Sequence, residues 1–177
     1  KKNILTLIKL HLNKKITYNH LFRIAVNNKI ISISLRKKIK IKKNFNLKLI
    51  NYQRIEPAYK NLKYKKILNL LKKLDMSKFD IALCNENKVL ETGTSNIIFV
   101  KKNIIYSPIN KFYKGTTLKF FEKKLKNIKK KNIFVNSLDS YEEIILLGSG
   151  KGVVSIKHIK KPYWKRKSLR TYRFLLK

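Results

Sequence analysis

Short apolar runs of strand character, interrupted by a few amphipathic helical segments, are the feature that most constrains the fold of this chain. Two such runs, LFRIAV (21–26) and KIISISLR (29–36), are rich in β-branched and aromatic residues, and Asn27-Asn28 between them is typical of a hairpin turn. In contrast, segment 59–74 carries apolar residues at helical spacing. The chain therefore contains helices as well as strands, and the strands are expected to pair with strands that are close in sequence.

The remaining predicted elements continue this alternation. A glycine turn divides EIILLGSGKGVVSIKHI (143–159) into two strands, and the turn at Asn85-Glu86-Asn87 separates two more, FDIALCNEN and KVLETGTSNIIFV. The complete order predicts an α+β fold with a mixed, partly barrel-like sheet and flanking helices. The other predicted strands are 44–53, 102–109 and 132–138, and the other predicted helices are 3–12, a segment that begins near Gly115, and 165–177.

The charge of the chain is extreme but does not by itself indicate a nucleic-acid reader. Among 177 residues there are 44 lysines and arginines and only 9 acids, which gives a formal net charge of +35. Only six of the basic residues are arginines, whose forked guanidinium reads bases and phosphates. The accompanying abundance of Asn, Ile, Tyr and Phe fits an AT-rich coding sequence. We therefore expect nucleic acids to bind only non-specifically, through net charge.

Several classes of site and location are disfavoured. Cys84 is the only cysteine, so no internal disulfide can form, and the three histidines lack metal-ligand spacing. No apolar run approaches the ~18 residues of a membrane span, and no cleavage signal follows the first residues. The sequence predicts a cytoplasmic protein without a metal site.

Two stretches are free of lysine and arginine in this lysine-rich chain. They are VLETGTSNIIFV (89–100), with the single acid Glu91, and IFVNSLDSYEEIILLGSG (133–150). Buried strands exclude lysine anyway, which explains the apolar parts of both stretches. It does not explain the small polar residues that follow Glu91. The adjacent acids Glu142 and Glu143 point to opposite faces of a strand, so we interpret them as structural.

Three local patterns together suggest a site for an anion. Gly115-Thr116-Thr117 stands at a predicted helix start, where free N–H groups favour anions, and GSG (148–150) forms a glycine turn that can present more of them. The P-loop pattern is absent, so a nucleotide triphosphate is not the expected ligand. A phosphate monoester on a cofactor fits better. The buried Glu91 would need a cationic partner nearby.

These segments together resemble the class IV, fold-type IV pyridoxal-phosphate enzymes, which include branched-chain and D-amino-acid aminotransferases and aminodeoxychorismate lyases. The matching segments are LETGTSNIIFV, IIYSPINKFYKGTTLKFF, YEEIILLGSGKGVVSI and EPAYKNLKYKKIL. They occur in the family's order with compatible gaps, from about residue 20 to the C-terminus. Each segment alone is weak evidence for the family, but the four segments in this order are a specific signature of it.

The resemblance implies a role for each matching residue. Lys60 would bind the aldehyde of pyridoxal 5'-phosphate as a Schiff base and then move a proton between Cα and C4′. Glu91 would pair with the protonated pyridine nitrogen. Lys63, close to Lys60, belongs to a solvated helix face. The other implied cofactor contacts are Tyr64 near the ring, Thr116 and Thr117 at the phosphate, and Ser149 and Gly150 at the phosphate and the substrate carboxylate.

The chain departs from the family pattern mainly in its length. The family has an N-terminal domain of which residues 1–20 would be a remnant or tail, while residues 21–177 would form the cofactor-binding C-terminal domain. The chain does not begin with methionine, so we expect either a fragment or a chain that has lost that domain. Leu118 replaces a common arginine and Thr92 a common glycine, and both changes look tolerable.

Two functions follow from these observations. The first is a pyridoxal-phosphate enzyme, an aminotransferase or an aminodeoxychorismate lyase of folate biosynthesis, which would act as a homodimer on an amino-acid-like substrate. The hairpin over 21–36 has no long insertion, which slightly favours the lyase or a small aminotransferase. The alternative is a catalytically inactive basic module on the same fold that binds RNA or another acidic partner. This alternative predicts that Lys60, Glu91 and Thr117 have been replaced. All three residues are present, which disfavours it.

Overall fold

The computed structural model describes residues 2–13, 15–125 and 127–177, and the chain divides into two compact units at Ile39 and Lys40. The first unit holds α1 (Lys2–His11) and an antiparallel hairpin of β1 (His20–Val26) and β2 (Ile31–Lys37). The Asn27 side chain accepts the backbone N–H groups of Lys29 and Ile30, at 2.9 and 2.7 Å, and so closes the turn. The hairpin lies in this first unit. The division of the chain at residue 20 stays a prediction.

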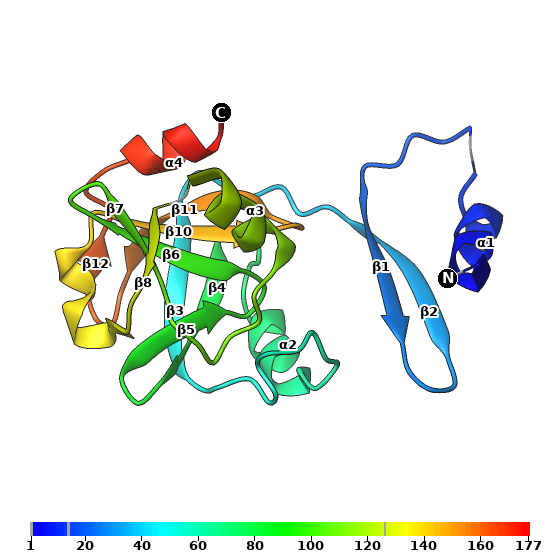
Figure 1. Ribbon diagram of the computed structural model, residues 1–177, viewed down its shortest axis with the longest axis horizontal. Coiled ribbons are helices and arrows are strands. Elements are labelled where there is room, and N and C mark those ends of the chain that lie inside the picture. Colours follow the sequence, from blue (N-terminus) through cyan, green and yellow to red (C-terminus); the bar gives the residue numbers. More distant parts are fainter. Residues whose placement is uncertain (1, 14, 126) are drawn as a thin grey trace. The chain divides into compact units, whose positions relative to one another are not determined.

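The second unit is built on one curled sheet, a half-barrel, whose described part contains ten strands (Figure 1). The strand order is β8-β7-β6-β10-β11-β3-β4-β5-β9, and β12 pairs with β11. The predicted α+β fold with a mixed, partly barrel-like sheet is therefore confirmed. The strands are β3 (Phe45–Asn51), β4 (Phe79–Asn85), β5 (Lys88–Thr92), β6 (Asn96–Lys101), β7 (Ile104–Ser107), β8 (Ile128–Lys130), β9 (Ile133–Phe134), β10 (Glu143–Gly148), β11 (Gly152–Ile159) and β12 (Trp164–Lys165).

Two helices serve as crossovers between parallel strands. Helix α2 (Lys65–Lys72) connects β3 to the parallel strand β4, and α3 (Thr116–Leu125) connects β7 to the parallel strand β8. Parallel neighbours cannot be joined by a tight turn, so the chain must leave the sheet at these two places. The remaining helices are η1 (Val135–Ser140), a 3₁₀ helix, and α4 (Arg170–Leu175).

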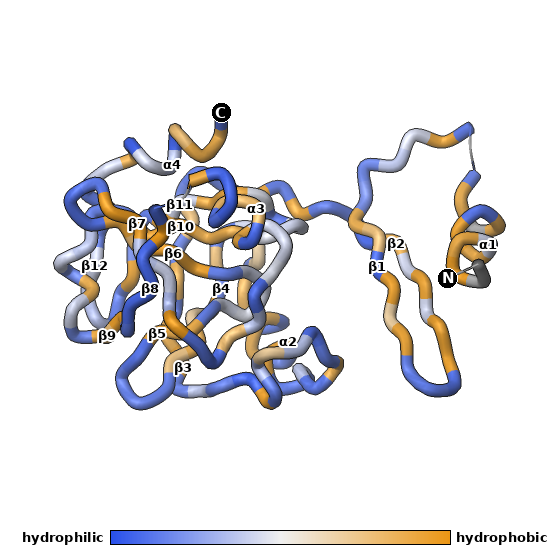
Figure 2. The backbone as a smooth tube through the Cα atoms, in the orientation of Figure 1, coloured by the Kyte–Doolittle hydropathy of each residue, from blue (hydrophilic) through white to orange (hydrophobic). Residues whose placement is uncertain are grey.

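The core follows the alternation of side chains along the strands. In β6, Ile97 and Phe99 enter the central cluster, while Ile98 and Val100 enter a second cluster beneath α3 and α4. A third cluster packs α2 on β4. Figure 2 shows the hydrophobic colour following the central strands, while the connecting loops are mostly hydrophilic.

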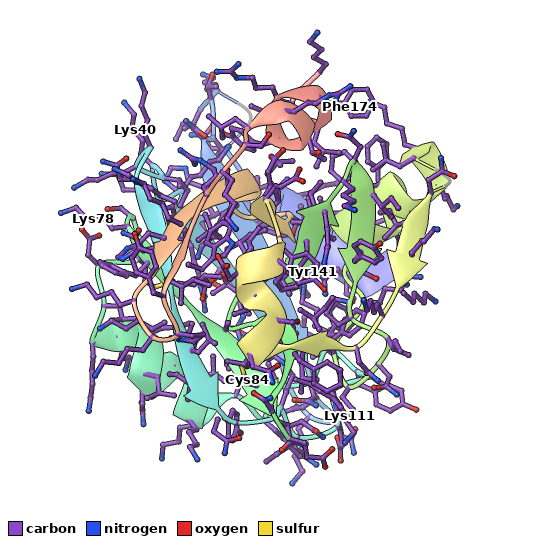
Figure 3. The ribbon with its side chains drawn as sticks, turned by 90° about the vertical axis from the view of Figure 1, so that its left-hand side faces the viewer. Lys40, Lys78, Cys84, Lys111, Tyr141 and Phe174 are labelled. Carbon is purple, nitrogen blue, oxygen red and sulfur yellow. The ribbon has the colours of Figure 1, made fainter. Side chains whose placement is uncertain are left out.

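Most lysines of the second unit lie at its surface, and several aromatic residues lie in its interior. Figure 3 shows Lys40, Lys78 and Lys111 extending outward, whereas Tyr141 lies inside the fold. The only tryptophan, Trp164, is fully buried and its indole N–H donates to the carbonyl of Tyr141 at 2.9 Å. Within the described residues, no helix is long and apolar enough to cross a membrane.

Several local predictions were wrong. KVLETGTSNIIFV is two strands, β5 and β6, because residues 93–95 form a turn between them. The helix predicted over 59–74 begins only at Lys65, after an irregular loop. The strand predicted over 132–138 is reduced to Ile133–Phe134, and η1 replaces its second half. The short strands β8 and β12 were not predicted.

Candidate active site

A tight turn between β5 and β6 is the centre of the candidate site. The Thr92 hydroxyl donates to the carbonyl of Ser95 at 2.9 Å, and the backbone N–H of Ser95 donates back to that hydroxyl at 2.9 Å. Gly93 fits because a Cβ there would lie 2.9 Å from the Ile81 side chain. The small polar residues behind Glu91 thus form a turn in a crowded interior, where larger side chains have no room.

Glu91 ends up buried beside an arginine. Its side chain is 4% exposed, and the Arg54 guanidinium lies 2.9 Å from Oε1 and 3.5 Å from Oε2. Burial raises the pKa of Glu91, and the hydrogen bond and charge of Arg54, with the backbone of Tyr113, hold that rise back. A cationic partner for Glu91 was expected from the sequence, but Arg54 was not identified as that partner. The available signal was that Arg54 is one of only six arginines and lies six residues before Lys60.

Lys60 lies in the irregular loop before α2. Its Nζ is 5.9 Å from the ring centroid of Tyr113, a cation–π contact. Among the described residues its amine has no carboxylate partner, whereas Lys63 pairs with Glu56 at 2.7 Å. The amide of Asn61 donates to two backbone carbonyls of the same loop and fixes its shape. Lys60 is exposed and its amine is chemically available.

The loop before α3 is fastened to the sheet by Asn96. The Asn96 amide donates to the Tyr113 carbonyl at 2.7 Å and accepts the Gly115 N–H at 2.9 Å. A Cβ on Gly115 would lie 2.9 Å from that same amide oxygen, so a larger residue would displace the Asn96 side chain. Tyr113 therefore lies close to both Lys60 and Glu91, and α3 begins directly behind it at Thr116. Thr116 is exposed and Thr117 is half-buried.

The glycine turn after β10 lies against the same central turn. A Cβ on Gly148 would be 2.6 Å from the hydroxyl oxygen of Ser95. Of the following residues, Ser149 is exposed and Gly150 is half-buried. The structure thus places this turn next to the residues that follow Glu91, although the sequence separates them by more than fifty positions.

Asp80 and Lys151 form a buried ion pair that the sequence analysis missed. Lys151 Nζ lies 2.9 Å from Asp80 Oδ2, and the two side chains are 8% and 0% exposed. The Thr94 hydroxyl donates to that oxygen at 2.6 Å, and the Thr92 hydroxyl oxygen lies 3.1 Å from it. No sequence signal could have found this pair, because its members are 71 residues apart.

Tyr64 and the paired acids occupy structural positions. Tyr64 is the N-cap residue of α2 and packs against the apolar cluster of that helix. Its role near a cofactor ring stays a prediction. Glu143 is buried and accepts the N–H groups of Thr171 and Tyr172 at 2.8 and 2.9 Å, at the start of α4. Glu142 faces elsewhere and accepts the backbone N–H of Lys102.

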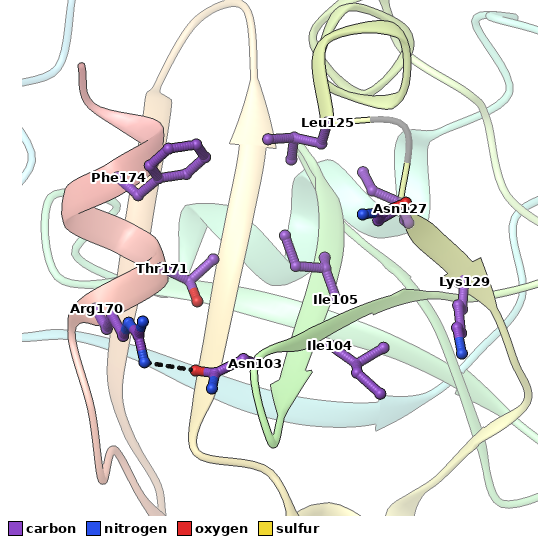
Figure 4. A pocket seen from close by; sticks show the side chains of 10 residues that line it. Asn103, Ile104, Ile105, Leu125, Asn127, Lys129, Arg170, Thr171 and Phe174 are labelled. Atoms are coloured by element: carbon purple, nitrogen blue, oxygen red, sulfur yellow. Dashed lines mark hydrogen bonds between the residues drawn. The ribbon is translucent and has the colours of Figure 1, made fainter.

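A sizeable pocket lies away from this site. It has a volume of about 670 Å³, and Figure 4 shows it between α4, β7 and the end of α3, with Arg170 donating to Asn103 at 3.2 Å. None of the residues assigned to the cofactor lines it. The candidate cofactor residues instead surround Tyr113, whose ring lies 5.9 Å from Lys60 Nζ and whose backbone bonds to Glu91.

The donor set at the central turn suits one kind of ligand. An available lysine amine can bind an electrophilic carbonyl, a buried carboxylate can pair with a basic ring nitrogen, and a helix N-terminus can hold a phosphate. Within the described part of the chain, no three His, Cys, Asp or Glu side chains gather to hold a metal ion.

The comparisons with known proteins agree in family and fold. The family of amino-transferase class IV matches residues 1–159. A candidate 4-amino-4-deoxychorismate lyase from Legionella pneumophila superposes with a TM-score of 0.67 at 17% identity, and covers 82% of this chain and 60% of its own. A branched-chain aminotransferase from Thermoproteus uzoniensis with norvaline gives 0.65 at 18%, with 81% and 55% covered.

A third structure carries a form of the cofactor. A hypothetical aminotransferase from Mycobacterium tuberculosis, with alpha-ketoglutarate and PMP bound, gives a TM-score of 0.64 at 14% identity, with 75% of this chain and 53% of that chain covered. At these identities the likeness shows the fold alone. No curated protein matches the chain. The chain spans 55–60% of the length of the first structures that it matches.

Proposed function

Because this chain belongs to the class IV aminotransferase family, we propose that it is a pyridoxal-phosphate enzyme acting on the amino group of an amino-acid-like substrate. The observation that supports the proposal is that Tyr113 contacts both candidate groups: Lys60 Nζ lies 5.9 Å from its ring, and its backbone bonds to Glu91. The PMP-bound structure of the Mycobacterium tuberculosis aminotransferase supports the choice of cofactor. No finding favours the inactive basic module.

Lys60 is the catalytic residue of this proposal. When bound, pyridoxal phosphate supplies an electron sink that stabilises negative charge at the substrate Cα. The Lys60 amine would hold the cofactor covalently at its aldehyde carbon, with the aldehyde oxygen leaving as water, and once freed it would take and return the proton at Cα. Its lack of a carboxylate partner among the described residues supports this role, because a salt-bridged amine would be fixed in its charged form.

Glu91 holds the ring nitrogen in its protonated form through its negative charge. Burial works against that charge, and Arg54 counteracts the effect of burial. The guanidinium leaves the carboxylate oxygens with lone pairs for a second donor, since each oxygen can accept more than one hydrogen bond. Arg54 thereby orients Glu91 toward the cofactor, and we assign it as a positioning residue.

The phosphate binds at the N-terminus of α3. The first-turn N–H groups of a helix have no intrahelical partner, so those of Thr116 and Thr117 are suited to an anion, with the Thr117 hydroxyl as a further donor. The turn at Ser149 and Gly150 supplies contacts to the phosphate and the substrate carboxylate. Asn96 supports this arrangement, because it fixes the loop that leads into the helix.

The substrate and the reaction branch form the finer part of the proposal. The structural neighbours include both aminotransferases and a candidate aminodeoxychorismate lyase, so we propose one of these two activities, in a cytoplasmic homodimer. The two are separated by their products. Aminodeoxychorismate as substrate would release pyruvate in the lyase, whereas an aminotransferase would convert an amino acid and a 2-oxo acid into a new pair.

The covalent site is tested by reduction and peptide mapping. The protein is mixed with an equimolar amount of pyridoxal phosphate, reduced with borohydride and digested. We expect the pyridoxyl label on Lys60 in the wild type and in K63R, and its loss in K60R. Lys63 is the matched control because it is an exposed lysine of the same loop that is paired with Glu56. Label that is absent, or spread over many lysines, would overturn the proposal.

A further inference from the structure

We propose that the Asp80–Lys151 ion pair is a positioning device that keeps the turn behind Glu91 and the turn carrying Ser149 in register for the cofactor. This inference rests on the proposed function. It adds two residues to the site that have no contact with the candidate catalytic groups themselves. Both act through the two turns that they connect.

One carboxylate oxygen joins the two turns. Asp80 Oδ2 accepts from Lys151, just before β11, at 2.9 Å and from the Thr94 hydroxyl in the central turn at 2.6 Å, and the Thr92 hydroxyl oxygen lies 3.1 Å from it. The other oxygen, Oδ1, accepts the backbone N–H of Ile81 at 2.8 Å. Removing the carboxylate would therefore take this link from both turns at once, and among the described residues no other ion pair joins the two turns.

The energetics favour a role in geometry over a role in stability. Bringing a carboxylate and an ammonium out of water costs about as much as their attraction returns, so an apolar pair of similar size would serve stability equally well. Buried ion pairs instead restrict the number of ways in which the surrounding groups can pack. The position of this pair, directly under the central turn, is where such a restriction would affect cofactor binding.

Lys151 is not a second candidate for the covalent lysine. Its side chain is 8% exposed, and its amine bonds to Asp80 and lies 4.8 Å from the ring centroid of Phe45. A covalent lysine must be accessible to the cofactor aldehyde, whereas this amine is enclosed and bonded to Asp80. In the mapping experiment, Lys151 should therefore stay unlabelled, and label on it would overturn its assignment as a positioning residue.

The test compares folding with cofactor affinity in matched variants. D80N/K151M removes both charges together, keeps the size of both side chains and leaves no unpaired buried charge. We expect its unfolding midpoint without cofactor to stay close to that of the wild type, while its affinity for pyridoxal phosphate falls about tenfold or more. The affinity is measured by titration of the cofactor absorbance. Affinity equal to that of the wild type, in a double variant that folds, would overturn the proposal.

Two further variants keep the test decisive if the double variant does not fold. T94V removes one hydroxyl donor to Asp80 and leaves the ion pair in place, and it should lower the affinity by a smaller factor. K151R preserves the charge and should retain more affinity than K151M. Equal affinities of the wild type, T94V and K151M would contradict the proposal. Absence of specific labelling in the wild type would instead show that the proposed function fails.

Discussion

The guanidinium of Arg54 lies 2.9 Å from the carboxylate of Glu91 in a place where only 4% of the glutamate side chain is exposed. The two residues come from the loop after β3 and the end of β5, so the fold brings them together. Burial disfavours the charged carboxylate, and Arg54 favours it. The ionisation of Glu91 is thus set by a balance that a single substitution can shift.

The first prediction concerns the dependence of stability on pH. The pKa of Glu91 is raised in the folded state above the ordinary value of 4.5, so the folded state binds this proton more tightly than the unfolded state. The contribution of Glu91 is fully present below 4.5 and is lost as the pH rises through the folded pKa. We expect the free energy of unfolding of the wild type, relative to E91Q, to fall over that interval. Urea unfolding followed by the fluorescence of the buried Trp164 measures it.

Substitution of Arg54 should extend the interval. R54M removes the hydrogen bond and the charge that hold the pKa of Glu91 down, so the loss of stability should continue to higher pH than in the wild type. E86Q is the control, since Glu86 is 63% exposed and its removal should leave the profile unchanged. Identical profiles for R54M and the wild type would contradict the assignment of Arg54 as the group that controls Glu91.

The second prediction concerns the Asn96 amide. N96A removes the bonds to the Tyr113 carbonyl and the Gly115 N–H, at 2.7 and 2.9 Å, and leaves both backbone groups unsatisfied in a part-buried place. We expect a loss of about 1–3 kcal/mol in the free energy of unfolding, together with weaker binding of pyridoxal phosphate. Urea unfolding and cofactor titration measure the two effects.

An exposed asparagine provides the matched control for that change. N132A alters an exposed residue outside the candidate site and should change the free energy of unfolding by less than about 0.5 kcal/mol, with no effect on cofactor affinity. If N96A binds the cofactor as tightly as N132A does, Asn96 does not organise the phosphate end of the site.

The elements that could be predicted are those determined by residues close together in the sequence. The β1–β2 hairpin follows from the strand pattern around Asn27, and α3 follows from the Gly115-Thr116-Thr117 start. The turn at 93–95 was not predicted because strand-like residues continue on both sides of it. The reason for the turn is tertiary, since the Ile81 side chain packs directly against Gly93. The loop before Lys65 was missed because the amide of Asn61, bound to backbone carbonyls, outweighs the helical pattern.

The partners of the charged site residues could not be predicted from sequence. Glu91 was identified from its motif, but its cation, Arg54, is 37 positions away and is chosen by the pairing of distant strands. Asp80 showed no signal either, since its position in a buried strand is known only from the fold. Local patterns therefore identify candidate site residues, while the contacts that tune them depend on tertiary structure.

The third prediction uses the close approach of Gly148 to Ser95. In G148A the new methyl group would lie 2.6 Å from the serine hydroxyl oxygen and 3.2 Å from its Cβ, so the Ser95 side chain or one of the two turns must shift. We expect a loss of about 1–3 kcal/mol in the free energy of unfolding. In an S95A background the nearest atom becomes the Cβ at 3.2 Å, and the same substitution should cost less. Equal costs in the two backgrounds would show that the turns are not in contact.

The last prediction concerns the single thiol. Cys84 lies in β4 with 6% of its surface exposed, and burial raises the pKa of its thiol to about 11. Only the thiolate attacks a disulfide reagent, so at pH 8 the folded protein should react far more slowly with Ellman's reagent than free glutathione does. In denaturant the thiol returns to its ordinary pKa, and the reaction should become complete within minutes. If the folded protein instead reacts as fast as glutathione, β4 opens readily, and the burial of Asp80 and Leu83 in the same strand would have to be transient as well.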